Sequence, residues 1–215
     1  MKKQFCFLFI MPLLMALNSC DRSDPEMLKY YKVYNRSISP GEDAGSVHLN
    51  KRNDGGIAWM IGKKFKYGII EFDAKGKDDY QASFVGLAFH GVNDTIYECV
   101  YFRPFNFRAT DPGRQGHAVQ YVALPHFDWS TLRDKRPGEF EQPISPAPDP
   151  FSWFHVRITV ASKNISVYVN GAKTASLNVE PLMQTDGEQI GYWVGNGSAG
   201  DWKNFRITPI EQVVK

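Results

Sequence analysis

Side chains that could act on a small ligand gather in one stretch of the sequence, between residues 90 and 133. We predict His90 and Glu98 as catalytic residues there, because a histidine beside a carboxylate can serve as a general acid/base pair. The same stretch holds the residues that we predict to bind substrate, which are Arg103, His117, Gln120, Tyr121 and Trp129. Planar polar groups next to aromatic rings suit the hydroxyls and the C–H faces of a sugar, so we expect a sugar-binding groove.

Two alternatives remain open for these side chains. A cluster of histidine and carboxylate groups could hold a divalent metal ion instead, so the sequence leaves the cofactor undecided. The residues could also be separate surface groups and salt bridges that brace the loops.

The elements that must position these residues are predicted to be β-strands. Short segments rich in Val, Ile, Phe, Tyr and Trp are separated by Gly, Asn, Asp and Pro. The segments are residues 68–74, 83–90, 97–102, 118–123, 154–161, 165–170, 189–194 and 202–207. No run of ten or more residues has a convincing helical periodicity. The pattern therefore predicts an all-β domain built as an antiparallel sandwich or barrel.

Strand alternation predicts which side chains share a face. In residues 83–90 the larger apolar residues would face the core, and the small Gly86 and Ala88 would leave room outside for a ligand. In residues 97–102, Tyr101 and Cys99 would face the core and Glu98 would point outward. If the strands are neighbours, His90, Glu98 and Gln120 line one groove, and a bend before Pro104 turns Arg103 into it.

Two stretches are predicted to be long loops, residues 103–116 and residues 124–152. The second holds five prolines between Pro137 and Pro150, which should make it stiff. Loops of this length in a compact domain are uncommon and often functional.

The C-terminal third carries a specific succession of motifs. It reads Trp153-Phe154-His155-Val156, then Val167-Tyr168-Val169-Asn170-Gly171, Ile190-Gly191-Tyr192-Trp193 and Asp201-Trp202-Lys203-Asn204-Phe205-Arg206-Ile207. This succession resembles the concanavalin A-like lectin/glucanase superfamily, and most closely bacterial domains called 3-keto-disaccharide hydrolases, loosely family-16 glycoside hydrolases. The resemblance implies a jelly-roll β-sandwich and a glycan-active hydrolase.

One departure from the family-16 pattern concerns catalysis. The family's E-x-D-x-x-E strand is matched by Glu71 and Asp73, but Gly76 stands where the last glutamate belongs. The retaining mechanism of that family is therefore not supported. A non-catalytic carbohydrate-binding protein is the main alternative, and a laminin G-like protein-adhesion module is the second. We expect Trp193 and Trp202 to fill the core.

The N-terminal residues predict export. Lys2 and Lys3 precede an apolar run that is too short to span a bilayer and has the length of a signal-peptide core. The run ends Leu17-Asn18-Ser19-Cys20, which resembles the bacterial lipobox and implies cleavage before Cys20 and its lipidation. We expect a signal peptide over residues 1–20, a flexible tether over residues 21–29 and one domain over residues 30–215. The lipid would anchor the protein to a cell membrane, expected to be a Gram-negative outer membrane.

Composition excludes some partners and sites. A net charge of +2 without a block of like charges gives no support for nucleic acid as a partner. Once Cys6 and Cys20 are assigned to the signal peptide and the lipid, only Cys99 remains in the domain. The domain therefore has neither an internal disulfide nor a Cys-x-x-Cys zinc site. The expected partners are carbohydrate and the membrane.

Overall fold

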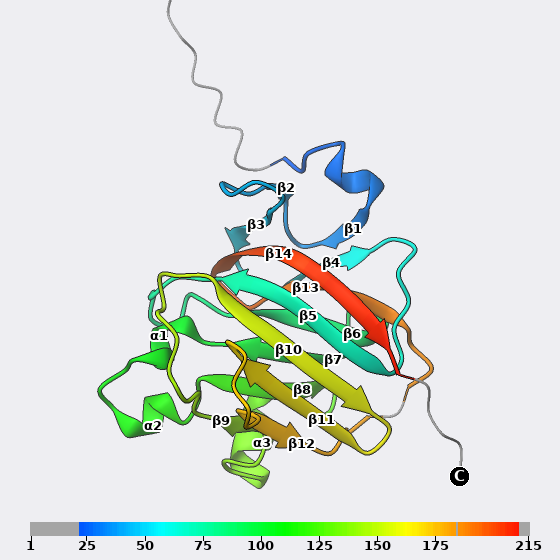
Figure 1. Ribbon diagram of the computed structural model, residues 1–215. Helices are drawn as coiled ribbons and strands as arrows, with labels where there is room; N and C mark the ends of the chain where they lie inside the picture. The colour runs from blue at the N-terminus through cyan, green and yellow to red at the C-terminus, as the bar shows by residue number, and fades with distance from the viewer. Residues whose placement is uncertain (1–21, 184, 211–215) are drawn as a thin grey trace, which may run out of the picture.

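Two antiparallel sheets form the molecule, as a computed structural model that describes residues 22–183 and 185–210 shows (Figure 1). Each sheet has seven strands. In order across the first sheet they are β1 (Tyr31–Tyr34), β4 (Gly56–Met60), β13 (Gln189–Val194), β6 (Val85–Asn93), β7 (Ile96–Phe102), β8 (Val119–Leu124) and β9 (Glu141–Gln142). In order across the second they are β12 (Leu177–Val179), β11 (Asn164–Val169), β10 (Phe154–Ala161), β5 (Gly68–Lys75), β14 (Ser198–Pro209), β3 (Val47–Arg52) and β2 (Ile38–Pro40). The predicted all-β antiparallel sandwich is confirmed.

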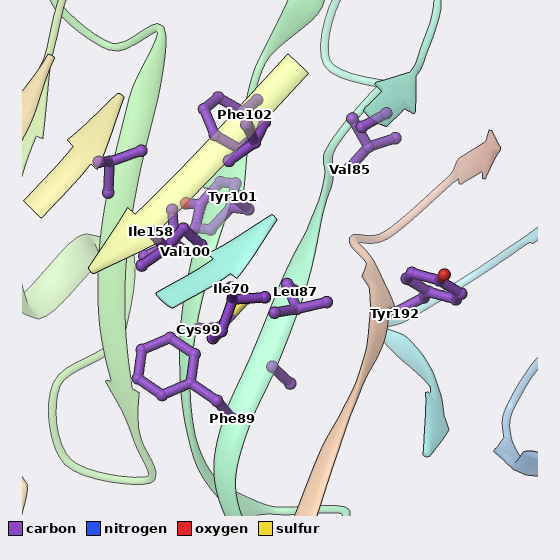
Figure 2. Packing of buried hydrophobic residues seen from close by; sticks show 14 of the residues in the cluster. Ile70, Val85, Leu87, Phe89, Cys99, Val100, Tyr101, Phe102, Ile158 and Tyr192 are labelled. Carbon is purple, nitrogen blue, oxygen red and sulfur yellow. The ribbon is translucent and has the colours of Figure 1, made fainter. Parts of the chain in front are cut away.

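The core lies between the two sheets. Alternate residues of β10 are buried, as its sequence pattern predicts, and the same alternation holds in β5. Aromatic pairs join the layers: Phe102 packs against Phe154 with ring centroids 5.1 Å apart, and Tyr192 stacks on Trp202 at 5.0 Å. Trp202 is fully buried, as expected. Figure 2 shows Ile70 and Ile158 of the second sheet beside Leu87 and Val100 of the first.

The inward and outward faces of β7 differ from the prediction. The register pairs Leu87 with Val100 and Phe89 with Glu98. Directly opposed residues of an antiparallel pair share a face, so Glu98 lies on the core side with Leu87 and Phe89. Tyr101 and Cys99 consequently lie on the outer side, away from the second sheet. The prediction was wrong here because it assigned a charged residue to solvent, whereas Glu98 is buried with hydrogen-bond partners.

The two long stretches predicted as loops contain short elements. Helices α1 (Pro104–Phe107) and α2 (Pro112–Gln115) lie in the first, and α3 (Trp129–Lys135) and β9 lie in the second. Asp128 caps α3 by accepting a hydrogen bond from the Thr131 amide at 2.7 Å. Phe140 is buried, so the proline-rich stretch packs onto the sandwich. In Figure 1 these three helices lie at the end of the molecule opposite to β1 and β2.

The ordered domain begins before residue 30. Ser23 accepts a hydrogen bond from the Ile38 amide at 3.1 Å, and the Asp24 amide donates to the Ile38 carbonyl at 2.7 Å. The 3-10 helix η1 (Met27–Lys29) follows and contacts β1 and β2. Residues 23–29 therefore pack on the sandwich, in place of the flexible tether that we predicted. The expected signal peptide and Cys20 lie outside the described residues. No helix among the described residues is long and apolar enough to cross a membrane.

Candidate functional site

Three predicted residues meet on the outer face of the first sheet. Gln120 lies opposite Tyr101 in the register of β8 and β7, and the Tyr101 hydroxyl donates to the Gln120 Oε1 at 2.7 Å. Arg103 Nη2 donates to the Tyr101 hydroxyl at 2.8 Å and also to Gln120 Oε1. Arg103 Nη1 donates to the His117 carbonyl at 2.8 Å. The bend at Pro104 thus turns Arg103 toward Gln120, as expected.

The side-chain amide nitrogen of Gln120 forms no hydrogen bond with the described residues. Both hydrogen bonds to this side chain enter Oε1, which fixes the amide orientation and leaves Nε2 on the other side. Nε2 is buried and has no hydrogen-bond partner among the described residues. Buried polar groups are normally paired, so Nε2 is an exception on this face. Gln120 is 0% exposed, so a ligand can contact Nε2 only if a covering side chain moves.

Glu141 provides the negative charge of the outer face. Arg133 holds it with two hydrogen bonds, from Nε at 2.8 Å and from Nη2 at 2.7 Å, and Arg103 lies 3.7 Å away. Burial opposes ionisation of Glu141, but the hydrogen bonds and charge of Arg133 outweigh it and hold its pKa below the usual value. His117 Nδ1 lies 2.9 Å from Glu141 Oε2, although the contact does not have hydrogen-bond geometry.

His117 is a partly exposed titratable group of this face. Burial lowers its pKa, and the nearby arginines lower it further, although Glu141 acts in the opposite direction. The imidazole is therefore neutral at pH 7 and can both donate and accept a hydrogen bond. Its side chain is one-third exposed, so a ligand can reach it.

Aromatic rings extend the polar array across the sheet. Trp193 of β13 packs against Tyr101 with ring centroids 5.0 Å apart. Its indole Nε1 donates to the Tyr97 hydroxyl at 3.1 Å, which fixes the ring. Trp193 is partly exposed, contrary to our expectation that it fills the core. The neighbouring Phe84 packs on Tyr101 at 6.2 Å.

Trp129 lies at the rim of this face. It is the first residue of α3 and is half exposed, and the guanidinium of Arg133 lies 5.2 Å from its ring centroid. Trp129 therefore joins the cluster through Arg133 and Glu141. We use the name outer-face site for Tyr101, Arg103, His117, Gln120, Trp129, Glu141 and Trp193 together.

The predicted catalytic pair lies on the opposite side of the same sheet. Glu98 is 0% exposed and its Oε2 is 2.6 Å from His90 Nδ1. Tyr121 donates to Glu98 Oε1 at 2.8 Å and accepts from the Leu182 amide at 3.0 Å. His90, Glu98 and Tyr121 thus form one buried cluster. The expectation that His90 and Glu98 share a groove with Gln120 was wrong, because β7 and β8 present Glu98 and Gln120 to opposite faces.

His90 reaches the core side because the strand is irregular there. Its φ is +51°, in the left-handed region, and the pairing of β6 with β7 shifts between Phe89 and Asn93. Such a bulge turns the following side chain out of the regular alternation. The ring is stacked on Phe65 at 6.0 Å and lies at the wall of a small pocket of about 250 Å³, with Thr185 and Met183.

The hydrogen bonds of His90 define its proton count. Nε2 lies 2.6 Å from the Lys66 carbonyl, which can only accept, so Nε2 carries a hydrogen. Nδ1 faces the Glu98 carboxylate, and a hydrogen bond there requires one further proton shared between the two groups. All donors and acceptors of this cluster that face each other are then satisfied, and His90 has no free nitrogen for a substrate.

The space over Gly86 is not open to a ligand. A Cβ at this position would lie 2.6 Å from the Cβ of Tyr101, so the tyrosine already fills the room that we assigned to a ligand. The acids of the E-x-D strand lie elsewhere, on the second sheet. Glu71 is paired with Arg206 at 2.7 Å and Asp73 contacts His155 at 2.8 Å.

The part of the chain that the structure describes contains no arrangement of side chains that suggests a metal centre. No group of three or more His, Cys, Asp and Glu side chains there could hold a metal ion. The ion pairs of the outer-face site join one carboxylate to basic groups and do not bring several carboxylates together.

Sequence reasoning missed Tyr101, Glu141, Arg133 and Trp193 as members of the site. Tyr101 and Trp193 were assigned to the core because aromatic residues in strands usually pack inward. The sequence offered one hint for Arg133 and Glu141. They are oppositely charged residues on either side of the apolar Phe140, in a stretch that we predicted to be a loop. Their eight-residue separation carries no periodicity that would connect them.

Comparisons with known proteins identify the fold. No family model and no curated protein matches the chain. The carbohydrate-binding module CBM66 from Bacillus subtilis is similar in structure, with a TM-score of 0.60 and 11% identity over 83% of this chain and 95% of that one. The VIP36 exoplasmic/lumenal domain with Ca²⁺ and Man3GlcNAc has a TM-score of 0.57 at 9% identity, covering 89% and 90%. A galectin-like protein of unknown function from Bacillus subtilis has 0.56 at 13%, covering 87% and 93%.

These likenesses establish a lectin-like β-sandwich of the concanavalin A type. The expected fold, an antiparallel jelly-roll β-sandwich, is confirmed. The identities are too low to carry an activity from these proteins to this chain.

Proposed function

We propose that the domain binds carbohydrate at the outer-face site. The observation that carries this proposal is the partly exposed Trp193 ring, fixed by its hydrogen bond to Tyr97 and packed on Tyr101. A rigid aromatic surface suits the C–H face of a sugar ring, and it gives up little conformational freedom on binding. His117, whose side chain is one-third exposed, is joined to Tyr101 through Arg103 and can offer hydrogen bonds to the hydroxyls of the same sugar.

The fold supports this proposal as an analogy. Two of the similar structures are described as a carbohydrate-binding module and as a domain with a bound mannose-containing glycan. Both share the two-sheet architecture, and neither shares enough sequence to transfer a site.

The test is a binding titration with matched tryptophan variants. Trp193→Ala should weaken binding of a glycan selected from an oligosaccharide panel by at least about fivefold, the loss expected for a residue that contributes 1 kcal/mol or more. Trp153→Ala is the control, because Trp153 is also partly exposed and anchored through its indole nitrogen, but lies against Asp43 and Lys203 on the second sheet. Equal losses in both variants, or no glycan bound by the native protein, would contradict the proposal.

A hydrolase of the 3-keto-disaccharide type is the second candidate. Its support is His90, a strained residue at the wall of the 250 Å³ pocket, because left-handed backbone at a non-glycine residue is frequent at functional sites. The complete burial of Glu98 and the engagement of both His90 nitrogens favour binding over this reaction. Mass spectrometry of an oligosaccharide panel decides: product that disappears in Glu98→Gln would establish the hydrolase.

We further propose that Cys20 carries lipid and holds the protein at a cell membrane, expected to be a Gram-negative outer membrane. The support is the sequence of residues 1–20 alone. The mass of the mature N-terminal peptide tests it, and Cys20→Ala should move the protein out of the membrane fraction. Protein adhesion of the laminin G kind becomes the leading function if no glycan is bound or cleaved.

A further inference from the structure

One end of the first sheet exposes apolar side chains among lysines. Tyr30 is 65% exposed, Ile61 55% and Val92 45%. Lys32, Lys63 and Lys64 lie among them, since these lysines line one open pocket of about 590 Å³ together with Ile61 and Val92. We call these six residues the lysine-rich edge.

The backbone makes the lysine-rich edge one continuous surface. The Ile61 amide donates to the Tyr30 carbonyl at 2.8 Å, so the two exposed side chains lie side by side where β4 ends and β1 begins. Gly62, with φ of +74°, turns the chain immediately after Ile61. Ile61 is therefore presented at the tip of a tight turn, where it protrudes from the sheet.

Asp186 and Glu188 line the same pocket, so the three lysines lie beside two acidic groups. Lys64 pairs with Glu188 at 2.9 Å, but Lys32 and Lys63 form no ion pair with any described residue. Free ammonium groups around protruding aliphatic and aromatic side chains suit the phosphates and the headgroup region of a lipid bilayer. Trp59 lines the same pocket but its ring is 2% exposed, so it offers no stacking surface that would favour a sugar there.

The proposed lipid anchor would bring this edge to a bilayer. Ser23 is held on β2 by its hydrogen bond to Ile38, and it lies three positions after Cys20 in the sequence. Three extended residues span about 10 Å, so lipidation of Cys20 would keep β1, β2 and η1 close to the membrane surface. Figure 1 shows η1, β1 and β2 together at one end of the molecule.

We propose that the lysine-rich edge docks on an anionic lipid bilayer, with Tyr30 and Ile61 in the headgroup region and Lys32 and Lys63 on lipid phosphates. This inference rests on the proposed anchor at Cys20. It also deepens the proposed function, because it sets the orientation of the glycan site. Strand β13, which carries Trp193, lies two positions from β1 across the first sheet, and β8, which carries Gln120, lies five positions from it. At about 4.8 Å per strand, docking would place the outer-face site beside the docked edge, with its residues about 10 to 24 Å from β1.

Lysine labelling tests the docked orientation. The full lipidated protein is placed in vesicles of phosphatidylcholine and phosphatidylglycerol, and acetylation of each lysine is compared with that of the free Cys20→Ala chain. We expect Lys32 and Lys63 to be labelled several-fold more slowly on the vesicles. Lys135 in α3 and Lys173 after β11, which are exposed and line neither this pocket nor the one beside His90, are internal controls and should be labelled equally in both states. Equal labelling of all four lysines would overturn the proposal.

A partition experiment tests the chemistry without the anchor. The Cys20→Ala chain should sediment with vesicles that contain phosphatidylglycerol more than with phosphatidylcholine alone. Replacing Lys32 and Lys63 by Gln should weaken this partition about 30-fold, at about 1 kcal/mol for each lysine near the surface. The matched double variant Lys135→Gln with Lys173→Gln should retain it. Indistinguishable partition of the two double variants would also overturn the proposal.

The result of the docking experiments can be distinguished from the results for glycan binding and for lipidation. Glycan binding is measured on the Cys20→Ala chain in solution, where no membrane is present, so failure of docking leaves it unaffected. An unmodified mass for the N-terminal peptide would remove the anchor and overturn docking in the form proposed here.

Discussion

Removing the Glu98 side chain should expose how strongly the buried cluster holds the sandwich together. Glu98→Ala leaves His90 Nδ1 and the Tyr121 hydroxyl facing each other across an empty space, with Glu98 itself 0% exposed in the native protein. Deleting one partner of a buried pair costs about 3–5 kcal/mol. Two buried groups that lose a partner at about 1–3 kcal/mol each give a similar figure.

Glu98→Gln is the matched control. Its amide nitrogen can donate to Nδ1 of a neutral His90, which still donates from Nε2 to the Lys66 carbonyl. Its amide oxygen can accept from Tyr121. Because the shape and all the hydrogen bonds are kept, we expect a loss of no more than about 1 kcal/mol.

Urea unfolding of the three proteins gives the comparison. The alanine variant should lower the free energy of unfolding with an unchanged slope, and should lower Tm by about 6–20 °C for a domain of this size. A loss below about 1 kcal/mol in Glu98→Ala would refute the view that these hydrogen bonds are formed in a dry core. A glutamine variant as unstable as the alanine variant would show that the negative charge of Glu98 matters more than the hydrogen bonds that glutamine can keep.

Two further predictions concern the outer-face site. The pKa of Glu141 is lower in the folded protein than in the unfolded chain, so its contribution is present above the unfolded pKa and is lost as pH falls through the folded value. The stability difference between native protein and Glu141→Gln should therefore be about 1–2 kcal/mol at pH 7, given that Arg133 is partly exposed, and should shrink below about pH 4; a pH-independent difference in thermal or urea unfolding would contradict this. Gly86→Ala places a Cβ 2.3 Å from the Val100 carbonyl oxygen and should cost roughly 1–3 kcal/mol and weaken glycan binding by displacing Tyr101. Gly55→Ala, whose Cβ would meet only an ordinary contact at 3.7 Å, should do neither in the same denaturation and binding assays.

The strands that sequence reasoning found and missed differ in their patterns. All eight predicted segments are strands, because each alternates apolar residues over a buried face or carries a run of β-branched and aromatic residues, as β10 does. The first four strands were not predicted. Edge strand β1 buries little, and β4 is buried along its whole length and so shows no alternation. The Asp54-Gly55 turn between β3 and β4 was the available signal, although it joins two different sheets.

The side-chain orientations on β7 depended on information that a single strand does not contain. Alternation alone separates Glu98 from Tyr101 correctly, but does not say which of them faces the core. We placed the charged residue outside because an unpaired carboxylate in a core is costly. That cost disappears when His90 and Tyr121 supply hydrogen bonds, and both come from other strands whose register is fixed only by the tertiary fold.

The two polar clusters on β7 and β8 lie on opposite faces of the first sheet. They differ in how completely their side chains are hydrogen-bonded and buried, and this difference indicates which cluster can contact a ligand. On the inner side, Glu98, His90 and Tyr121 satisfy one another and neighbouring backbone groups, so the cluster serves the packing of the sandwich. On the outer side, Arg103 donates hydrogen bonds to Tyr101, Gln120 and the His117 carbonyl and so acts as a brace. Beside this brace the Trp193 ring and the His117 side chain are partly exposed, as a binding protein requires of the groups that meet its ligand. Exposure of a rigid aromatic ring therefore favours Trp193 over the completely buried Glu98 and its partner His90, the pair that residue types first suggest.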